Sequence, residues 1–297
     1  MAPPPSLPPE SRRRHLKRSF DEAVHREWNR HQGDPWRVLR RTLRERFLRS
    51  HLRETEGPIL ELGPGPGRFT PILRTGRTRT VVAVDLSRAS LIAARRRSAR
   101  SKRAAPVHWI EAAGERLPLR SSVFSSVIAL GNIISFASVD GRALVTELAR
   151  VTKPGGSFIG DFASPVGATQ EFFHYAARHR FLPRVLRRRR FYFLDQVLAD
   201  GFQPYAPHRL GRWEFKFYTA EEAVELLRAT GFRVVDIMSI APVARMDERI
   251  IASAHRRGDT WRSLLQIEEI VGRRPGVFES GDGFIVCAKR SSEPARG

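Results

Sequence analysis

The chain has 297 residues and a formal net charge of +21, from 52 Lys and Arg against 31 Asp and Glu. A chain of this length can bury about 75% of the surface that its unfolded form exposes, so its core needs no covalent staples. The single cysteine, Cys287, excludes a disulfide framework and a cysteine-built metal site, and its apolar surroundings indicate a buried structural thiol. The N-terminus lacks the apolar run of a signal peptide, and no stretch is apolar for long enough to span a bilayer. We therefore expect a soluble, cytoplasmic protein without a metal centre.

The positive charge is compatible with nucleic-acid binding, but arginine is spread through nearly every segment, so charge alone carries little weight. Denser basic runs occur at residues 12–18, 95–103 and 187–190. We interpret the first two as solvated helix faces. The third run lies beside the sequence FYF, and an anionic substrate, a membrane surface or RNA would suit it.

The N-terminal region divides into two parts. Residues 1–18 contain five prolines and then a basic cluster, which predicts a disordered tail. From Phe20 to about residue 53, apolar residues recur at helical spacing, which predicts two amphipathic helices with a break near residues 33–35. We assign residues 19–56 to these helices.

From residue 57 onward, short apolar runs alternate with helical segments. The apolar runs are PILEL, TVVAVD, PVHWIE, FSSVIAL and GGSFIGDF, and the segments between them include RFTPILRT, SRASLIAARRRSA and DGRALVTELARV. Such alternation builds a parallel sheet with helices on both faces. Ser87 and Asp140 are suited to cap two of the helices. We assign residues 57–163 to this core.

The alternation is lost for about fifty residues after Phe162, which is too long for a plain connection. It resumes at FYTAEEAVELLRATGFRVVDI, where Thr219 and Glu222 form a capping box and Gly231 ends the helix before a strand. A helix near residues 260–271 and a last strand, GFIVCAK, complete the core over residues 213–290.

The stretch ILELGPGPGRFT, residues 59–70, joins a strand to a helix through Gly63, Gly65 and Gly67. Glycine allows φ values and close approaches that a Cβ would block, and backbone N–H groups beside a helix N-terminus can wrap a nucleotide-like ligand. We expect Gly67 to let the following helix pack tightly. The next strand ends in Asp85, eighteen residues after Gly67, where a carboxylate can accept hydrogen bonds from both hydroxyls of a ribose. The loop and the acid together predict a ligand that contains a ribose.

The spacing G-x-G-x-G differs from the G-x-G-x-x-G of dinucleotide-binding folds. Together with VVAVDLS, EAAGERLPLRSSVFSSVIAL, ELARVTKPGGSFIGDF and FYTAEEAVELLRATGFRVVDI, the loop resembles the class I S-adenosylmethionine-dependent methyltransferases over most of residues 57–163 and 213–240. The resemblance implies a Rossmann-like α/β fold with a seven-stranded sheet in the order 3-2-1-4-5-7-6 and an antiparallel last strand. It also implies S-adenosyl-L-methionine as cofactor and a helical substrate cap at residues 164–212.

The resemblance further implies roles for individual residues. Residues of the first strand and loop would face the methionine part, and the end of the second strand would hold the ribose and adenine. The loop after the third strand would lie along the adenine edge, and the loop after the fourth strand would close the pocket. In that order, the implied cofactor-binding residues are Glu61, Gly63, Gly65, Gly67, Asp85, Leu86, Gly114, Glu115, Gly131 and Asn132. Two positions depart from the family pattern, because Ala113 stands where many relatives carry an acid and Ser125 stands where an aspartate is common.

Methyl transfer from a sulfonium is an in-line displacement, so the protein mainly aligns the acceptor and excludes water, and a general base is needed only if the acceptor must lose a proton. The loop ALGNIISF lacks the Asn/Asp-Pro-Pro-aromatic signature of enzymes that methylate base amino groups. The leading hypothesis is a small-molecule or lipid-like acceptor, with an anionic one as a variant, and the alternative is an RNA-binding protein or RNA methyltransferase. The polar candidates on the acceptor side are His174, Tyr175, Tyr205 and His208. The reacting atom of the acceptor and the oligomeric state stay open.

Overall fold

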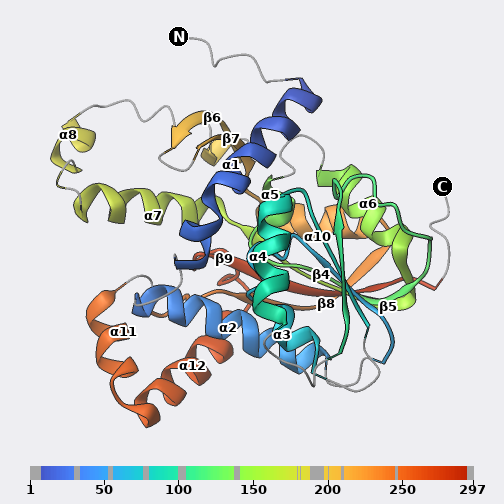
Figure 1. Ribbon diagram of the computed structural model, residues 1–297. Helices are drawn as coiled ribbons and strands as arrows, with labels where there is room; N and C mark the ends of the chain where they lie inside the picture. The colour runs from blue at the N-terminus through green and yellow to red at the C-terminus, as the bar shows by residue number, and fades with distance from the viewer. Residues whose placement is uncertain are drawn as a thin grey trace.

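The computed structural model describes residues 8–29, 34–52, 56–75, 80–99, 105–136, 141–178, 180, 182–187, 197–199, 201–208, 211–244 and 247–292. A central sheet is flanked by helices, and a smaller group of helices and two short strands lies beyond one end of it (Figure 1). No helix among these residues is long and apolar enough to cross a membrane.

The central sheet has seven strands. They are β1 Ile59–Leu62, β2 Val81–Asp85, β3 Val107–Glu111, β4 Phe124–Ala129, β5 Thr152–Ala163, β8 Phe232–Ser239 and β9 Gly283–Arg290. Their order is β3-β2-β1-β4-β5-β9-β8, and β9 is antiparallel to both of its neighbours while β1 to β5 pair in parallel. This confirms the predicted order 3-2-1-4-5-7-6 with an antiparallel last strand.

Helices cover both faces of the sheet. The helices of the core are α2 Pro35–Leu52, α3 Thr70–Leu73, α4 Arg88–Ser98, α5 Ile133–Phe136, α6 Gly141–Val151, α10 Ala220–Ala229, α11 Glu248–His255 and α12 Gly258–Gly272. Because successive strand side chains point to opposite faces, Ile59 belongs to an apolar cluster with residues of α2, α11 and α12, whereas Leu60 belongs to another with residues of α6 and α10. Two separate apolar cores result, one on each face.

The local signals that end and begin elements are confirmed where the structure describes them. The Ser87 side chain accepts from the Ser90 N–H at the start of α4, and Thr219 and Glu222 form the capping box of α10. Gly231, which follows the C-cap residue Thr230 of α10, has φ +90°. Asp140 lies outside the described residues. Cys287 is buried in β9, and burial raises the pKa of its thiol to about 12, which fits a structural thiol.

The N-terminal tail is the first correction. Helix α1 spans Pro9–Asn29, so the prediction of disorder is wrong for residues 9–18, and residues 1–7 lie outside the description. Few apolar residues mark this stretch because its contacts are polar and distant in sequence: Lys17 Nζ donates to Glu111 Oε1 at 2.8 Å, 94 residues away. The predicted helix break is confirmed in position, since α1 ends at Asn29 and α2 begins at Pro35.

The cap is the second correction. It contains the helices α7 Pro165–Arg178 and α8 Leu182–Arg187, as predicted, but also an antiparallel pair of strands, β6 Phe202–His208 and β7 Gly211–Lys216. The predicted cap was helical and ended at residue 212, whereas β7 continues to Lys216. Prolines at 204 and 207 interrupt the alternation in β6, and the strand-like alternation in β7, with Trp213 and Phe215 between charged residues, is only six residues long.

Candidate functional site

A cavity of about 470 Å³ lies over the carboxyl ends of β1, β2 and β4, where open α/β sheets bind ligands. Its walls come from the glycine loop after β1, the turn after β2, the loop after β3, the loop after β4, and the helices α1 and α2. Of the predicted cofactor residues, those that line it are Gly63, Gly65, Asp85, Leu86, Gly114, Glu115, Gly131 and Asn132. The structure thus brings residues from four separate loops to one cavity.

The glycine loop needs its glycines. Gly63, Gly65 and Gly67 have φ values of +65°, +52° and +84°, in the left-handed region that residues with a Cβ rarely adopt. A Cβ on Gly63 would overlap the side chain of Ile133, and a Cβ on Gly67 would lie 2.9 Å from the Cβ of Ala94. The close packing predicted at Gly67 is therefore made with α4 rather than with α3, the helix that follows the loop.

Asp85 connects the end of β2 to the glycine loop. Its Oδ2 accepts from the Gly65 N–H at 2.9 Å, and its Oδ1 accepts from the Ser87 N–H at 2.8 Å. Burial raises the pKa of this carboxyl to about 6, against the lowering effect of those two backbone hydrogen bonds. A carboxylate held in this way presents its remaining lone pairs to the cavity that it lines.

Glu61 lies next to the cavity but is not one of its lining residues. It is 3% exposed, and its Oε2 accepts from the Thr70 hydroxyl at 2.7 Å. Burial raises the pKa of Glu61 to about 7, the Thr70 hydrogen bond opposes that rise, and the nearby Asp85 adds to it. Gly67 is the other predicted residue that does not line the cavity.

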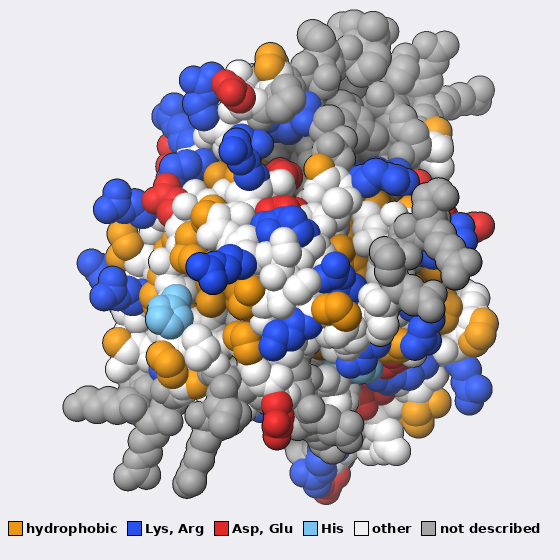
Figure 2. Space-filling view, turned by 90° about the vertical axis from the view of Figure 1, so that its right-hand side faces the viewer, with side chains coloured by type: hydrophobic (Ala, Val, Ile, Leu, Met, Phe, Trp, Pro, Cys, Tyr) orange, Lys and Arg blue, Asp and Glu red, His pale blue; other side chains and the backbone are white. Residues whose placement is uncertain are grey.

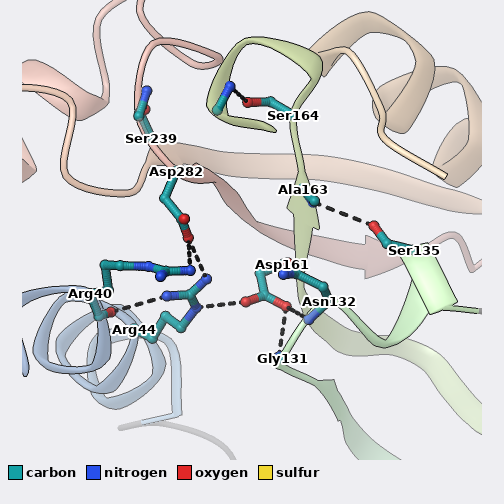
Figure 3. A network of polar contacts seen from close by, with 12 residues as sticks. Arg40, Arg44, Gly131, Asn132, Ser135, Asp161, Ala163, Ser164, Ser239 and Asp282 are labelled. Atoms are coloured by element: carbon teal, nitrogen blue, oxygen red, sulfur yellow. Dashed lines mark hydrogen bonds and ion pairs between the residues drawn. The ribbon is translucent and has the colours of Figure 1, made fainter. Parts of the chain in front are cut away.

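A buried acid that sequence reasoning missed supports the loop after β4. Asp161 of β5 is fully buried, and its Oδ1 accepts from the backbone N–H groups of Gly131 at 2.8 Å and Asn132 at 2.7 Å (Figure 3). Gly131 and Asn132 both have positive φ, +96° and +61°. Asp161 therefore fixes an unusual backbone turn at the cavity wall.

Two arginines of α2 complete this network. The Arg44 Nε donates to Asp161 Oδ2 at 2.6 Å and its Nη2 donates to Asp282 Oδ2 at 3.4 Å, while Arg40 forms an ion pair with the same Asp282 (Figure 3). Burial disfavours the charge on Arg44, but Asp161 and Asp282 outweigh it, so the pKa of Arg44 is raised. Because Arg44 and Asp161 are 117 residues apart, no local pattern in the sequence could have paired them.

Helix α1 forms another wall that the sequence did not predict. Its side chains Arg12, Arg13, Leu16, Phe20 and Glu27 line the cavity. Phe20 contacts Phe136 edge-on, with ring centroids 5.3 Å apart, and Phe136 contacts Phe215 of β7 in the same manner at 4.8 Å. An apolar wall thus continues from α1 towards the cap.

The predicted acceptor-side groups are not brought to the cavity by the part of the chain that the structure describes. His174 in α7 is half-buried, its Nε2 lies 3.8 Å from Glu248 Oε1 of α11, and it is not a lining residue. Tyr175 lies in α7, and Tyr205 and His208 lie in β6, but their side chains lie outside the description.

Residues 59–156 match the family model described as a methyltransferase domain. No curated protein matches the chain. Solved structures with the same fold include magnesium protoporphyrin IX methyltransferase from Synechocystis PCC 6803, at 13% identity and a TM-score of 0.58 over 93% of this chain and 98% of that one. A second is 1,6-didemethyltoxoflavin-N1-methyltransferase from Burkholderia thailandensis, at 16% identity and a TM-score of 0.57 over 98% and 95%.

A third is a chain of a Haloferax volcanii complex that contains the Trm112 methyltransferase activator, at 17% identity and a TM-score of 0.58 over 95% of this chain and 100% of that one. At these identities the similar structures support only the fold. The family match supports the assignment of the domain that carries the glycine loop. Residues 59–156 of this chain therefore carry a methyltransferase domain, and the chain as a whole shares its fold with these solved structures.

Proposed function

We propose that this chain is an S-adenosylmethionine-dependent methyltransferase. Its acceptor is a small molecule or lipid-like molecule that binds beside the S-adenosylmethionine cofactor, under α1 and the cap. The observation that carries the proposal is the cavity itself, which α1 covers with Leu16 and Phe20 and which Phe136 extends towards β7. An acceptor that reaches this wall has to fit beneath a helix, which suits a compact apolar molecule better than a polymer.

The residues of the cavity fit the cofactor. The glycine loop leaves space that a Cβ at Gly63 would remove, Asp85 offers carboxylate oxygens for a ribose, and Leu86 and Glu115 line the part expected to hold adenine. Glu61 does not line the cavity, so it would act on the methionine part indirectly, through the residues around it. When bound, the cofactor supplies a methyl group that its sulfonium has already activated.

The chain's own contribution to the reaction is alignment and the exclusion of water. Phe20 and Phe136 are apolar and lie at the cavity, so they displace water from the side where the acceptor enters. The backbone turn at Gly131 and Asn132, fixed by Asp161, gives the wall next to Phe136 a defined shape. We assign no general base. Of the four acceptor-side candidates, only His174 has a described side chain, and it does not line the cavity.

Two of the similar structures are named for small molecules with ring systems, magnesium protoporphyrin IX and 1,6-didemethyltoxoflavin. These names agree with the acceptor class proposed for this chain without identifying its acceptor. The alternative, an RNA acceptor, is favoured only by the basic residues. On the face shown in Figure 2, Lys and Arg side chains are scattered among apolar and uncharged ones rather than gathered in one patch. Of the run at residues 187–190, Arg187 is described and exposed.

The proposal is tested by incubating the full chain with S-adenosylmethionine and a cell extract, and by measuring S-adenosylhomocysteine and methylated products by mass spectrometry. We expect turnover with the low-molecular-mass or lipid fraction and no loss of turnover after nuclease treatment. Turnover that requires the RNA fraction would favour the alternative. A variant with residues 187–190 changed to glutamine separates the two further, because it should keep its affinity for S-adenosylhomocysteine in either case and lose RNA retention only if the run binds RNA.

A further inference from the structure

The middle of α1 is attached to the turn that follows β2. Asp21 Oδ1 accepts from the Ser87 hydroxyl at 2.7 Å and from the Ala89 N–H at 3.2 Å. Ser87 in turn accepts from the Ser90 N–H with its hydroxyl oxygen and donates its own N–H to Asp85 Oδ1. Asp21 thus adds a second acid to the N-terminus of α4, where the helix dipole favours negative charge, and it contacts the residue that holds Asp85.

Lys17, one helical turn earlier, strengthens the same attachment. Its Nζ donates to the Leu86 carbonyl oxygen at 3.3 Å and to Glu111 Oε1 at 2.8 Å, and it lies 3.3 Å from Asp21 Oδ2. Glu111 is the last residue of β3. Lys17 therefore connects the turn after β2 to the end of the neighbouring strand, which are the two places that lead into the ribose and adenine part of the cavity.

The C-terminal end of α1 is attached to the glycine loop. Arg68, directly after Gly67, donates from Nη2 to the carbonyl oxygens of Glu27 at 3.1 Å and Trp28 at 2.8 Å, which belong to the last turn of α1. A cation at this place satisfies carbonyls that have no partner within the helix. The Trp28 ring contacts two cations, since the guanidinium carbons of Arg68 and Arg97 lie 5.1 and 3.9 Å from its centroid. Arg97 also donates to the Pro66 carbonyl at 3.2 Å.

Lys17, Asp21 and Trp28 are not among the lining residues of the cavity, yet each contacts a segment that is. We propose that they are positioning residues of the cofactor site, and that α1 acts as a brace that holds the ribose-binding turn and the glycine loop at a fixed separation. The inference rests on the proposed cofactor-binding roles of Asp85 and the glycine loop. It assigns a role in cofactor binding to residues that touch neither the cofactor cavity nor the acceptor.

The test compares single variants of the full chain in calorimetric titrations with S-adenosylhomocysteine and with adenosine, which lacks the methionine part. We expect Asp21→Ala and Lys17→Met to weaken the binding of both ligands about tenfold, because both ligands contain the ribose. Trp28→Leu should weaken S-adenosylhomocysteine binding more than adenosine binding, because it loosens the glycine loop. Asp21→Asn keeps an acceptor oxygen for Ser87 and should restore part of the affinity.

The matched control is the double variant Arg18→Ala, Glu22→Ala, which removes an ion pair on the exposed side of the same helix. It should bind both ligands as the wild type does. Hydrogen exchange provides the second measurement: in Asp21→Ala the amides of Ala89 and Ser90 should exchange faster, while those of β9 stay protected. If a variant unfolds, exchange rises in β9 as well, and the milder Asp21→Asn and Lys17→Met then decide.

Wild-type affinity in both Asp21→Ala and Lys17→Met would overturn the brace. Equal losses in these variants and in the control would also overturn it, because they would reflect the stability of the helix rather than specific contacts. A wild-type chain that binds neither ligand would instead contradict the proposed cofactor site, so the two failures are distinguishable.

Discussion

Asp85 accepts a hydrogen bond from the Gly65 N–H at 2.9 Å, and this contact joins the end of β2 to the loop that follows β1. The same carboxylate accepts from the Ser87 N–H at the start of α4. One acid therefore holds together the two backbone segments between which we place the cofactor's ribose. Both hydrogen bonds come from the protein's own backbone, so they orient the carboxylate and reduce the ordering that ligand binding requires.

Asp85→Ala is expected to weaken the binding of S-adenosylmethionine by about 1.5–3 kcal/mol, the scale of hydrogen bonds to a charged group. Isothermal titration calorimetry with S-adenosylmethionine measures the loss directly. Asp259→Ala is a suitable control, because Asp259 is a highly exposed acid on α12. Unchanged affinity in Asp85→Ala would contradict the ribose assignment.

Glu61 predicts a dependence of stability on pH. Its pKa is raised to about 7 in the folded protein, against about 4.5 for an unperturbed glutamate, so folding favours the neutral form. The stabilising contribution is complete below about pH 4.5 and is lost as the pH rises through 7. Glu61→Gln removes this titration while keeping an oxygen that can accept from the Thr70 hydroxyl.

We expect the ligand-free Glu61→Gln variant to gain on the order of 2–3 kcal/mol over the wild type between pH 5 and pH 8. The measurement is the free energy of urea unfolding of both proteins at several pH values, because other titrating groups cancel in the difference. A difference that does not change with pH would show that Glu61 is charged in the fold throughout this range.

The glycine loop allows a test with a closely matched control. Gly67 and Gly276 have nearly the same φ, +84° and +83°. A Cβ added to Gly67 would contact Ala94, whereas a Cβ added to Gly276 would have no atom within 4 Å. Gly276→Ala should cost about 1 kcal/mol of stability, from the left-handed backbone alone. Gly67→Ala should cost about 1–3 kcal/mol more, because the methyl group overpacks the contact with α4. Equal losses in urea unfolding would mean that α4 moves aside freely.

These features differ in how far they can be predicted from the sequence. The glycine loop, the Ser87 cap and the Thr219 capping box are local signals, so each was predicted at the right residue. The sheet order followed from the family resemblance, and the observed strand pairing confirms it. Asp85 was predicted because a strand-end acid at that interval after a glycine loop has a known geometric meaning.

The contacts of helix α1 and the role of Asp161 could not be predicted from the sequence. The contacts of α1 are made by Lys17 and Asp21 with partners 66 to 94 residues away, and the surrounding prolines and arginines resemble those of a disordered tail. Asp161 lies in an apolar strand, and its structural role depends on hydrogen bonds with Arg44 and with backbone groups of another loop. Only the assembled fold brings these partners together, since ion pairs and backbone acceptors leave no periodic pattern.

The Asp161–Arg44 pair gives the last prediction. Asp161→Ala would leave two backbone N–H groups without their acceptor, in a buried position. Arg44 would keep its contacts of 3.4 Å to Asp282 and to the Arg40 carbonyl oxygen but would lose its shortest one. Removing one partner of a buried ion pair costs about 3–5 kcal/mol, whereas replacing both partners can be nearly neutral. We therefore expect a large loss of stability for Asp161→Ala and a smaller one for the double variant Arg44→Met, Asp161→Asn, in which the asparagine oxygen still accepts from Gly131 and Asn132. Chemical unfolding measures both, and calorimetry with S-adenosylhomocysteine shows whether the turn after β4 keeps its shape.

Asp247→Ala, which removes an exposed cap of α11, is the control for losing an acid that serves backbone N–H groups at the surface. If Asp161→Ala were as stable as this control, the buried network would not be what fixes the wall of the cavity, and Gly131 and Asn132 would owe their conformation to other contacts.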